Sequence, residues 1–258
     1  MLALKVEKVT KIFPSLNSKG QEVLALDDVS LEVNKNEFYS ILGHSGCGKT
    51  TLLNLIAGFE VPTAGYIECA GKLVSTPGAD RSMVFQDYAL FPWLTVYDNI
   101  AFGLKIKGTG SVEIEQIVSR FAALVGLSQF IHHYPHQLSG GMRQRVSIAR
   151  ALVVDPTVLL MDEPFAALDA QNRSMMQAEM IRILNEESKT VVLVTHSIEE
   201  AINLSDVIVV MTRRPGRVKE IIRVPEPRRM VEDTPAYLAI RRQIRDLIAG
   251  EHDVSEAV

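Results

Sequence analysis

The sequence predicts an α/β layered domain, because short apolar segments with strand character alternate with segments of helical periodicity. Three segments in the second half, at 157–161, 190–195 and 207–212, are almost wholly apolar, which is typical of parallel strands covered on both faces. Helical patterns at about 172–187 and 197–204 separate these segments. Alternation of this kind indicates a parallel sheet with helices packed on it.

The first part of the chain predicts further short strands and one helix. The strand-like segments are rich in Val, Ile, Leu or Phe and have turn residues between them. A helical pattern at 50–57 follows the third of these segments, and Gly58 stands where a C-terminal helix glycine is expected. The predicted strands are 2–9, 23–33, 38–42, 65–69 and 82–85.

A helical insertion is predicted from about residue 88 to residue 153, because this stretch contains no convincing strand. Thr95 has the side chain expected of a helix N-cap. Ser111 opens a second helix, which has one apolar face and is closed by Gly126. A further helix is expected after Ser139.

The C-terminal part differs in composition from the rest. Residues 213–229 contain seven basic residues, two acidic residues and three prolines. This stretch is either a patch that faces anionic lipid headgroups or a solvated strand and linker. A last helix is predicted from Thr234, with Tyr237, Ile240, Ile244 and Leu247 on one side. This helix either packs on its own domain or forms a regulatory module.

Composition and charge exclude several classes of protein. With 27 basic and 31 acidic residues, the net charge of −4 argues against general nucleic-acid binding, which needs a basic face. The apolar content of 47% and the charged content of 22% are ordinary, so the chain is not disordered, collagen-like or a coiled coil. The only two cysteines, Cys47 and Cys69, fit a reducing compartment better than a disulfide framework.

No segment of the sequence is predicted to span a membrane. The strongest apolar runs, at 191–194 and 207–211, are far shorter than the ~20 residues that a spanning helix needs. Charged residues occur at Lys5 and Glu7, so the N-terminus lacks the uninterrupted apolar stretch of a secretory signal peptide. We therefore expect a protein that is made and kept in the cytoplasm.

A phosphate-binding loop is predicted directly after the segment 38–42, because the residues from Gly43 to Thr50 match the pattern G-x-x-x-x-G-K-[ST]. Glycines allow backbone N–H groups to approach phosphate oxygens, and the following helix adds partial positive charge. Lys49 would neutralise the β- and γ-phosphates of a nucleotide, and the Thr50 hydroxyl would bind Mg²⁺. The candidate nucleotide-binding residues are Gly43, His44, Ser45, Gly46, Cys47, Gly48, Lys49, Thr50 and Thr51.

A second candidate site lies at the end of the apolar segment 158–161, which is followed by Asp162 and Glu163. Strands of an open α/β sheet carry functional groups at their C-terminal ends, beside the phosphate loop. We expect Asp162 to bind Mg²⁺, directly or through water. Glu163 is expected to orient or deprotonate an attacking water molecule.

Between these two sites lies the motif Leu138-Ser-Gly-Gly-Met142, followed by Arg-Gln-Arg. With this motif the sequence resembles the nucleotide-binding subunit of an ABC transporter. The supporting motifs occur in the order typical of that family and span about residues 5–217. They are the phosphate loop, Gln86 in Val-Phe-Gln-Asp, the 138–142 signature, Asp162-Glu163, Asp169 in Ala-Leu-Asp and His196 in Val-Thr-His.

The resemblance implies a P-loop NTPase fold of the ABC type, with an antiparallel β subdomain and an inserted α-helical subdomain at about 88–153. It implies an ATPase domain at 1–225 and a C-terminal extension with one helix at 226–258. The implied ligands are ATP and Mg²⁺. The implied working unit is a homodimer or pseudo-dimer in which the signature residues Ser139, Gly140 and Gly141 of one subunit bind the γ-phosphate of ATP held by the other.

The resemblance also assigns roles to single residues. Glu163, Gln86 and His196 are the implied catalytic residues; Gln86 touches Mg²⁺ and the attacking water, and His196 holds the γ-phosphate. Asp169 shapes the facing nucleotide site. Phe13 stands where the family usually has an aromatic that stacks on adenine; the alternative is a plain core aromatic. The implied Mg²⁺ ligands are Thr50, Gln86 and Asp162.

The sequence departs from the family pattern at two positions. Met142 stands where many members carry Gln, so any polar contact of that Gln is absent. His44 stands where Pro is frequent.

Three further segments, 62–65, 91–99 and 214–218, resemble the nitrate, sulfonate, taurine and bicarbonate branch of importer ATPases. We therefore predict a subunit that powers import of a small anionic solute at the cytoplasmic face of the plasma (inner) membrane. The predicted partners are a second ATPase subunit, separate membrane permease subunits and, indirectly, an extracytoplasmic solute-binding protein, with no nucleic acid. The alternatives are the ATPase of an exporter or lipid-trafficking system, or a non-transport ABC ATPase that acts on nucleic acid.

The permease is expected to dock near residues 86–93, where aromatic side chains gather just after Gln86. Tyr88, Phe91 and Trp93 would line a groove that receives a helix of the permease. Alternatively, these aromatics pack inside their own domain.

Overall fold

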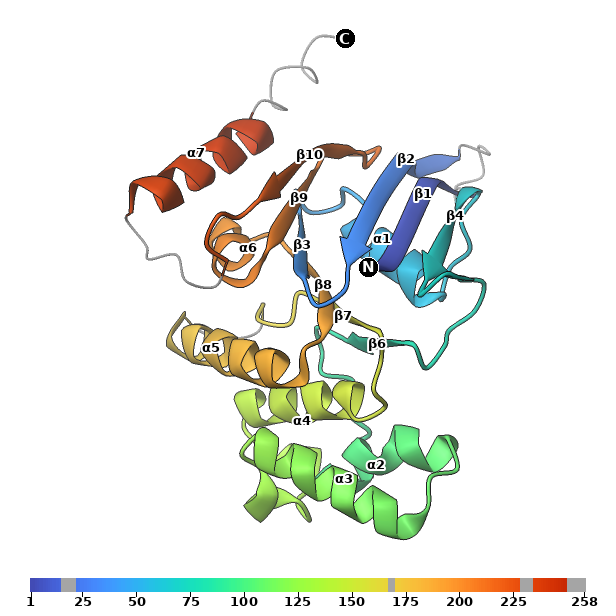
Figure 1. Cartoon of the computed structure of the whole chain (residues 1–258), viewed down its shortest axis with the longest axis vertical. Helices are drawn as coiled ribbons and strands as arrows, with labels where there is room; N and C mark the ends of the chain where they lie inside the picture. The colour runs from blue at the N-terminus through green and yellow to red at the C-terminus, as the bar shows by residue number, and fades with distance from the viewer. Residues whose placement is uncertain (15–21, 167–169, 228–233, 250–258) are drawn as a thin grey trace. The chain divides into compact units, whose positions relative to one another are not determined.

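The computed structural model describes residues 1–14, 22–166, 170–227 and 234–249 of the chain. These residues fall into two compact units, of which the first comprises Met1–Gly78 with Thr190–Val258 and the second comprises Ala79–Lys189. Each unit contains both strands and helices (Figure 1), so the predicted α/β class is confirmed.

The first unit contains an antiparallel sheet, as expected. Its strand order is β2-β1-β4-β5. Successive side chains of a strand point to opposite faces of the sheet, so every second residue lies on the same face. One face of this sheet is buried, and its side chains include Leu4, Val6, Leu31 and Val33. The strand predicted at 2–9 continues to Phe13, and the last strand is too short to give a sequence pattern. The strands are β1 (Leu2–Phe13), β2 (Val23–Asn34), β4 (Ala64–Cys69) and β5 (Lys72–Leu73).

The first unit also contains the parallel strands that carry the phosphate loop. β3 (Phe38–Leu42) pairs in parallel with both β8 (Thr190–Thr195) and β9 (Val207–Met211), and β10 (Val218–Arg223) pairs antiparallel with β9. All residues of β8 and β9 are buried, which confirms the prediction of strands covered on both faces, and β3 is buried throughout as well.

The helices of the first unit are α1 (Lys49–Ala57), α6 (Ile198–Leu204) and α7 (Pro235–Ala249). α1 ends at Gly58, as predicted. α7 buries Tyr237, Ile240 and Ile244 in a cluster with apolar side chains of β3, α6, β9 and β10. The C-terminal helix therefore packs on its own domain, which is one of the two alternatives that the sequence left open.

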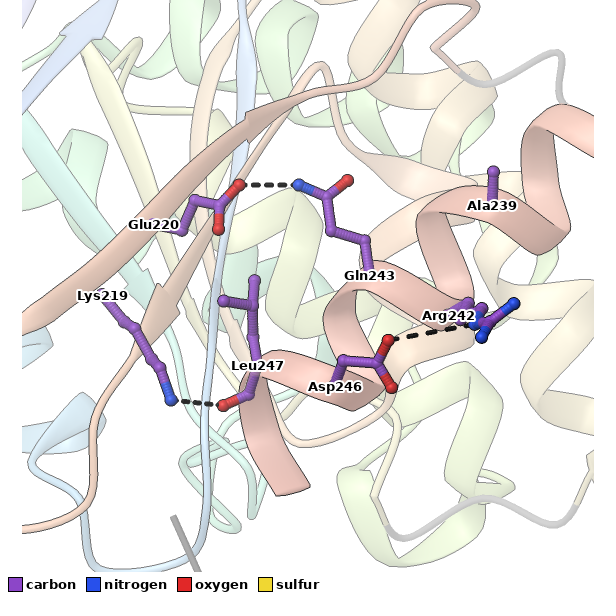
Figure 2. Close-up of a pocket in the computed structure, with 7 residues that line it drawn as sticks. All are labelled: Lys219, Glu220, Ala239, Arg242, Gln243, Asp246 and Leu247. Carbon is purple, nitrogen blue, oxygen red and sulfur yellow. Dashed lines mark hydrogen bonds and ion pairs between the residues drawn. The ribbon is translucent and has the colours of Figure 1, made fainter. Parts of the chain in front are cut away.

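β10 and α7 flank an open pocket of about 640 Å³ (Figure 2). Gln243 Nε2 donates to Glu220 Oε1 at 2.6 Å, and Lys219 Nζ donates to the carbonyl of Leu247 at 2.5 Å. Arg223 of β10 forms an ion pair with Glu37 at 3.0 Å. The two basic side chains of β10 are thus paired within the protein; Arg228 and Arg229 of the basic stretch 213–229 lie outside the described residues, so both alternatives for this stretch remain predictions.

The second unit contains one parallel strand pair and a set of helices. β6 (Arg81–Val84) pairs with β7 (Val158–Asp162). Residues 88–153, all of which are described, contain no strand, so the predicted helical insertion is confirmed. The helices are α2 (Val96–Ile106), α3 (Ser111–Leu124), α4 (Gly140–Leu152) and α5 (Ala170–Glu187), with short 3₁₀ helices η1 (Ser128–Phe130) and η2 (Pro135–Gln137).

The predicted N-cap Thr95 is confirmed by its hydrogen bond, and Ser139, after which a helix was expected, is also an N-cap. Thr95 Oγ1 accepts from the N–H of Asp98 at 3.1 Å, and Ser139 Oγ accepts from the N–H of Met142 at 3.3 Å. Each bond satisfies one of the N–H groups that the first turn of a helix leaves without a partner in the helix. The local signals in the sequence were therefore sufficient to predict where α2 and α4 begin.

Candidate functional site

The phosphate loop joins the end of β3 to the start of α1 in the first unit. Gly48, the N-cap of α1, has a φ of 102° in the left-handed region that favours glycine. A Cβ at this position would lie 2.7 Å from Leu26 Cδ2 and 3.0 Å from the carbonyl oxygen of Ala25. The loop therefore rests directly on β2, and its glycine is required by both backbone conformation and space.

Lys49 is held inside this loop. Its side chain is only 5% exposed, and its Nζ donates to the carbonyls of Gly43 at 2.8 Å and His44 at 2.9 Å. The loop thus curls around the ammonium group, which places a positive charge inside the predicted phosphate loop. Nε2 of His44 lies 3.4 Å from the carbonyl oxygen of Ile248 at the end of α7.

The remaining loop residues divide into exposed and buried ones. Ser45, Gly46 and Thr50 are exposed, and Thr51 is half-buried. Cys47 is buried, with its N–H donating to the His44 carbonyl at 3.3 Å. The exposed residues are the ones open to a ligand from solvent.

His196 lies next to the phosphate loop because of strand register. Leu42 of β3 is paired with Thr195 of β8, so Gly43 and His196 are the first residues after two neighbouring parallel strands. The turn that carries His196 is rigid, since Thr195 Oγ1 donates to Glu200 Oε2 at 2.6 Å and accepts from the N–H of Ser197 at 3.0 Å. The side chain of His196 is exposed at this edge.

A second polar edge lies in the second unit, at the ends of β6 and β7. Val84 of β6 is paired with Met161 of β7. Gln86 comes two residues after Val84, and Glu163 comes two residues after Met161. Gln86 is exposed, whereas Asp162 and Glu163 are half-buried. The register therefore brings the predicted glutamine and the two carboxylates to one edge.

Glu163 has an unusual backbone conformation. Its φ of 43° lies in the left-handed region, which non-glycine residues adopt rarely and at a cost of about 1–3 kcal/mol. The N–H of Ala166 donates to the Glu163 carbonyl at 3.1 Å, which fixes the turn after β7. Backbone strain of this kind is concentrated at functional sites.

The signature residues form the first turn of α4. Ser139 is exposed, and Gly140 and Gly141 are half-buried. A Cβ at Gly141 would lie 3.6 Å from Met176 Sδ, which is ordinary contact. Arg143 Nη1 donates to the Leu138 carbonyl at 3.0 Å and so holds the segment before the helix. The structure therefore presents this helix start toward solvent.

Two of the predicted nucleotide contacts lie at the margins of the described structure. Phe13 is the half-buried last residue of β1, and Lys11 Nζ lies 4.7 Å from its ring centroid in cation–π geometry. Asp169, together with the rest of the Ala-Leu-Asp motif, lies outside the described residues.

The aromatic segment after Gln86 is partly packed and partly exposed. The ring of Phe91 lies 4.5 Å from that of Phe102 and 5.7 Å from that of Trp93, measured between centroids. Trp93 is 70% exposed, whereas Phe91 packs against a ring of its own unit, so the members of the segment differ in burial and docking of a permease stays a prediction. A hollow of about 380 Å³ adjoins this segment and is lined in part by Phe85, Ala89, Phe91 and Phe102.

Two polar residues that sequence reasoning missed hold this segment in place. Asn99 is fully buried; its Oδ1 accepts from the Phe91 N–H at 2.9 Å, and its Nδ2 donates to the Phe91 carbonyl at 3.1 Å. Arg150 donates to the carbonyls of Ala89 at 2.6 Å and Tyr88 at 3.0 Å, and burial lowers the pKa of its guanidinium. The available signal was a polar residue on the apolar face of a helix.

Within the described residues, no three His, Cys, Asp or Glu side chains are grouped as they would be to hold a metal ion. None of the helices in the described part of the chain is long and apolar enough to cross a membrane.

Residues 26–166 match the family model described as ABC transporter. The chain is 51% identical, over 248 residues, to an uncharacterized ABC transporter ATP-binding protein of Methanocaldococcus jannaschii, covering 96% of this chain and 92% of that protein. It is 43% identical to the bicarbonate transport ATP-binding protein CmpD of a Synechocystis species (95% and 88% covered). It is 46% identical to the taurine import ATP-binding protein TauB of Roseobacter denitrificans (87% and 83% covered).

Among solved structures, the chain resembles the ATP-binding cassette MJ0796 in a dimeric post-hydrolysis state bound to ADP and Pi. The TM-score is 0.74 at 31% sequence identity, and the match covers 86% of this chain and 99% of the solved chain.

Proposed function

The chain belongs to the ABC transporter family, and we propose that it is the ATP-hydrolysing subunit that powers import of a small anionic solute. The predicted family, the ABC-type fold and the ATPase activity are confirmed. The observation that carries the assignment of the nucleotide site is the buried Lys49 ammonium, bonded to two carbonyls inside the phosphate loop. What remains a proposal is the role of each residue, the solute and the partners.

We propose that the phosphate loop and His196 bind the phosphates of ATP. The loop N–H groups and the start of α1 direct positive charge at the phosphate oxygens. Lys49 would exchange its bonds to the loop carbonyls for bonds to the β- and γ-phosphates. His196 would hold the γ-phosphate from the neighbouring strand end, which the pairing of Leu42 with Thr195 supports.

We propose that Glu163 activates the attacking water and that Gln86 helps to orient it. A carboxylate must lie within hydrogen-bond reach of the water to take its proton or to aim it at the γ-phosphate. The half-buried position of Glu163 directly after β7, at the edge that register shares with Gln86, supports a functional role for this side chain.

Mg²⁺ is proposed as the cofactor, with Thr50, Gln86 and Asp162 as ligands. Hydroxyl, amide and carboxylate oxygens are the donor types that this hard cation prefers, and it is usually held by few protein ligands together with substrate phosphates. The donor set of these three residues fits that pattern. When bound, the ion would neutralise charge that develops on the phosphate oxygens. The protein's own part is to present these oxygens.

Cassettes of this family dimerise and work with membrane permeases. For this chain we propose that Ser139, Gly140 and Gly141 of one subunit face the γ-phosphate bound by the other. Asp169 would shape the facing site, and Phe13 would stack on adenine. The ATPase domain would comprise residues 1–225, followed by a C-terminal extension at 226–258.

The permease partner is proposed to dock on the segment from Gln86 to Trp93, and the exposure of Trp93 supports this. The relatives named for bicarbonate transport and taurine import support a small anionic solute. The same names favour import over the exporter, lipid-trafficking and nucleic-acid alternatives. The complex would lie at the cytoplasmic face of the plasma (inner) membrane, with a solute-binding protein on the opposite side.

The test is purification of the tagged full chain from membranes of its own organism, with identification of the co-purified proteins by mass spectrometry. The complex is then reconstituted in proteoliposomes, and ATP hydrolysis is measured with and without taurine, sulfonates, nitrate or bicarbonate and the binding protein. The proposal expects a permease in the complex and hydrolysis stimulated by one of these solutes. Recovery of an exporter, or of nucleic acid in place of a permease, contradicts it.

A further inference from the structure

The turn at 212–217 contacts the phosphate loop through Gly216. A Cβ at Gly216 would lie 2.1 Å from the carbonyl oxygen of Cys47, 2.9 Å from Met211 Cε and 3.1 Å from Leu26 Cδ2. The methionine and leucine atoms belong to flexible side chains, but the first contact is with backbone. A side chain at 216 therefore fits only if the phosphate loop moves.

Gly216 is not required by its own backbone conformation, because its φ lies outside the left-handed region where glycine is favoured. The reason for glycine at this position is the close approach of two backbones. The segment 212–217 has no part in the proposed binding or hydrolysis of ATP.

The turn is itself held firmly, so it cannot recoil from the loop. The N–H of Gly216 donates to the Ala25 carbonyl at 2.9 Å, and the N–H of Asp27 donates to the Gly216 carbonyl at 3.0 Å. Thr212 Oγ1 accepts from the Arg217 N–H and donates to the Pro215 carbonyl, both at 2.9 Å. These bonds attach the turn to β2 and close it on itself.

β2 supports the phosphate loop from the same place. Leu26 Cδ2 would lie 2.7 Å from a Cβ at Gly48 and 3.1 Å from a Cβ at Gly216. The loop, the turn and β2 are therefore in mutual contact around Leu26. A change in the position of the turn must be transmitted to the loop, because close-packed groups of this kind leave no free volume.

The contact bears on phosphate binding through one peptide unit. The carbonyl of Cys47 and the N–H of Gly48 belong to the same planar group, so displacing the carbonyl also reorients the N–H. The N–H groups of a phosphate loop are its ligands for phosphate oxygens. We propose that Gly216 is a positioning residue, which holds the Cys47–Gly48 peptide so that the Gly48 N–H points at the bound phosphate. This inference rests on the proposed binding of ATP by the loop.

The test replaces Gly216 with Ala in the full chain and measures two quantities. The first is the Kd for ATP. We expect it to rise about tenfold, because one charge-assisted hydrogen bond to phosphate is lost. The second is the rate at which a maleimide reagent labels Cys47, and mass spectrometry measures this rate. Cys47 and Cys69 are both buried thiols, so each reacts only when its surroundings open. Displacement of the loop is expected to speed labelling of Cys47 and leave that of Cys69 unchanged.

The matched control is Gly110→Ala, at a glycine with an ordinary φ of −65° and no atom within 4 Å of an added Cβ. We expect this variant to retain wild-type ATP affinity and Cys47 labelling. If Gly216→Ala does not fold, Thr212→Val loosens the turn without added bulk and is expected to change both quantities in the same direction, by a smaller factor.

The outcomes separate the two proposals. Wild-type Kd and wild-type Cys47 labelling in Gly216→Ala would overturn the positioning role. Faster labelling of Cys47 and Cys69 together, with a lowered Tm, would also overturn it, because the effect would then be general destabilisation. If the wild-type chain bound no ATP, the proposed function would fail, while the labelling of Cys47 would still report whether Gly216 holds the loop.

Discussion

The two polar edges of this protein are built in different ways. At the phosphate-loop edge of the first unit, Lys49 is buried and bonded to two carbonyls, and Gly48 is packed against β2. At the carboxylate edge of the second unit, Gln86 is exposed and Glu163 is half-buried on a strained turn. The first edge is formed mainly by backbone and packing, and the second by individual side chains.

Because the two edges differ in this way, we expect binding and chemistry to be separable in this protein. Changes at the phosphate-loop edge are expected to alter ATP affinity and folding together, because the same contacts serve both. Changes at the carboxylate edge are expected to alter turnover alone. The following predictions test this separation, beginning with the largest expected effect.

The largest effect is expected from Glu163→Gln. Gln keeps the size and hydrogen-bonding reach of the side chain but cannot accept the proton of water, so kcat is expected to fall by roughly 10²–10⁴-fold. The Kd for ATP is expected to stay within about twofold of wild type, because the loop in the other unit is unchanged. Hydrolysis assays and fluorescent-nucleotide titration measure the two quantities. The variant should also accumulate as an ATP-bound dimer, visible by size-exclusion chromatography. Turnover at the wild-type rate would remove Glu163 from its proposed role.

A smaller effect is expected from Lys49→Ala, and it concerns ATP affinity instead of turnover. Loss of a charged donor to phosphate is expected to raise the Kd for ATP by about 10–100-fold. Lys72→Ala, at an exposed lysine of β5, is the matched control and should leave the Kd unchanged. If Lys49→Ala bound ATP normally and lost only turnover, the division between the two edges would be wrong.

The packing of the phosphate loop can be tested by comparing two of its glycines in the absence of nucleotide. Gly46 and Gly48 both have positive φ, but a Cβ at Gly46 meets no atom within 4 Å, whereas one at Gly48 meets β2. Gly46→Ala is expected to lower the free energy of unfolding by about 1–2 kcal/mol through backbone strain alone. Gly48→Ala is expected to cost about 1–3 kcal/mol more, because overpacking is added. Urea unfolding measures both, and equal losses would contradict the packing argument.

The smallest effect is expected at the start of β3, away from both edges. Tyr39 is buried and donates to Glu37 Oε2 at 2.9 Å; burial and this bond raise the pKa of Tyr39 to about 12. Because its folded pKa is raised, Tyr39 stabilises the fold fully below its unfolded pKa of about 10, and this contribution is lost as the pH rises toward 12.

Tyr39→Phe should therefore weaken the alkaline loss of stability and cost about 1 kcal/mol at neutral pH, the value of the lost hydrogen bond. ATP affinity and turnover should match wild type, because Tyr39 touches neither edge. The measurement is the free energy of unfolding of both proteins across this pH range. If the free energy of unfolding fell with pH equally steeply in both proteins, Tyr39 would not be the cause of the alkaline loss of stability.

Local patterns in the sequence determined much of this protein. The strands β3 and β8, the N-cap Thr95, the helix that follows Ser139 and the end of α1 at Gly58 agree with their predictions, because each depends on residues a few positions apart. The phosphate loop and the carboxylate pair were equally visible, because the chemistry of each site needs fixed residue types at fixed spacing.

Which of these residues lie close together depends on strand pairing across the sheet. The pairing of Leu42 with Thr195 brings His196 to the phosphate loop, and the pairing of Val84 with Met161 brings Gln86 to Glu163. The contact of Gly216 with the Cys47 carbonyl joins segments that are far apart in the chain. Strand register and close backbone approach depend on the packing of the whole domain, and a short stretch of sequence does not specify them.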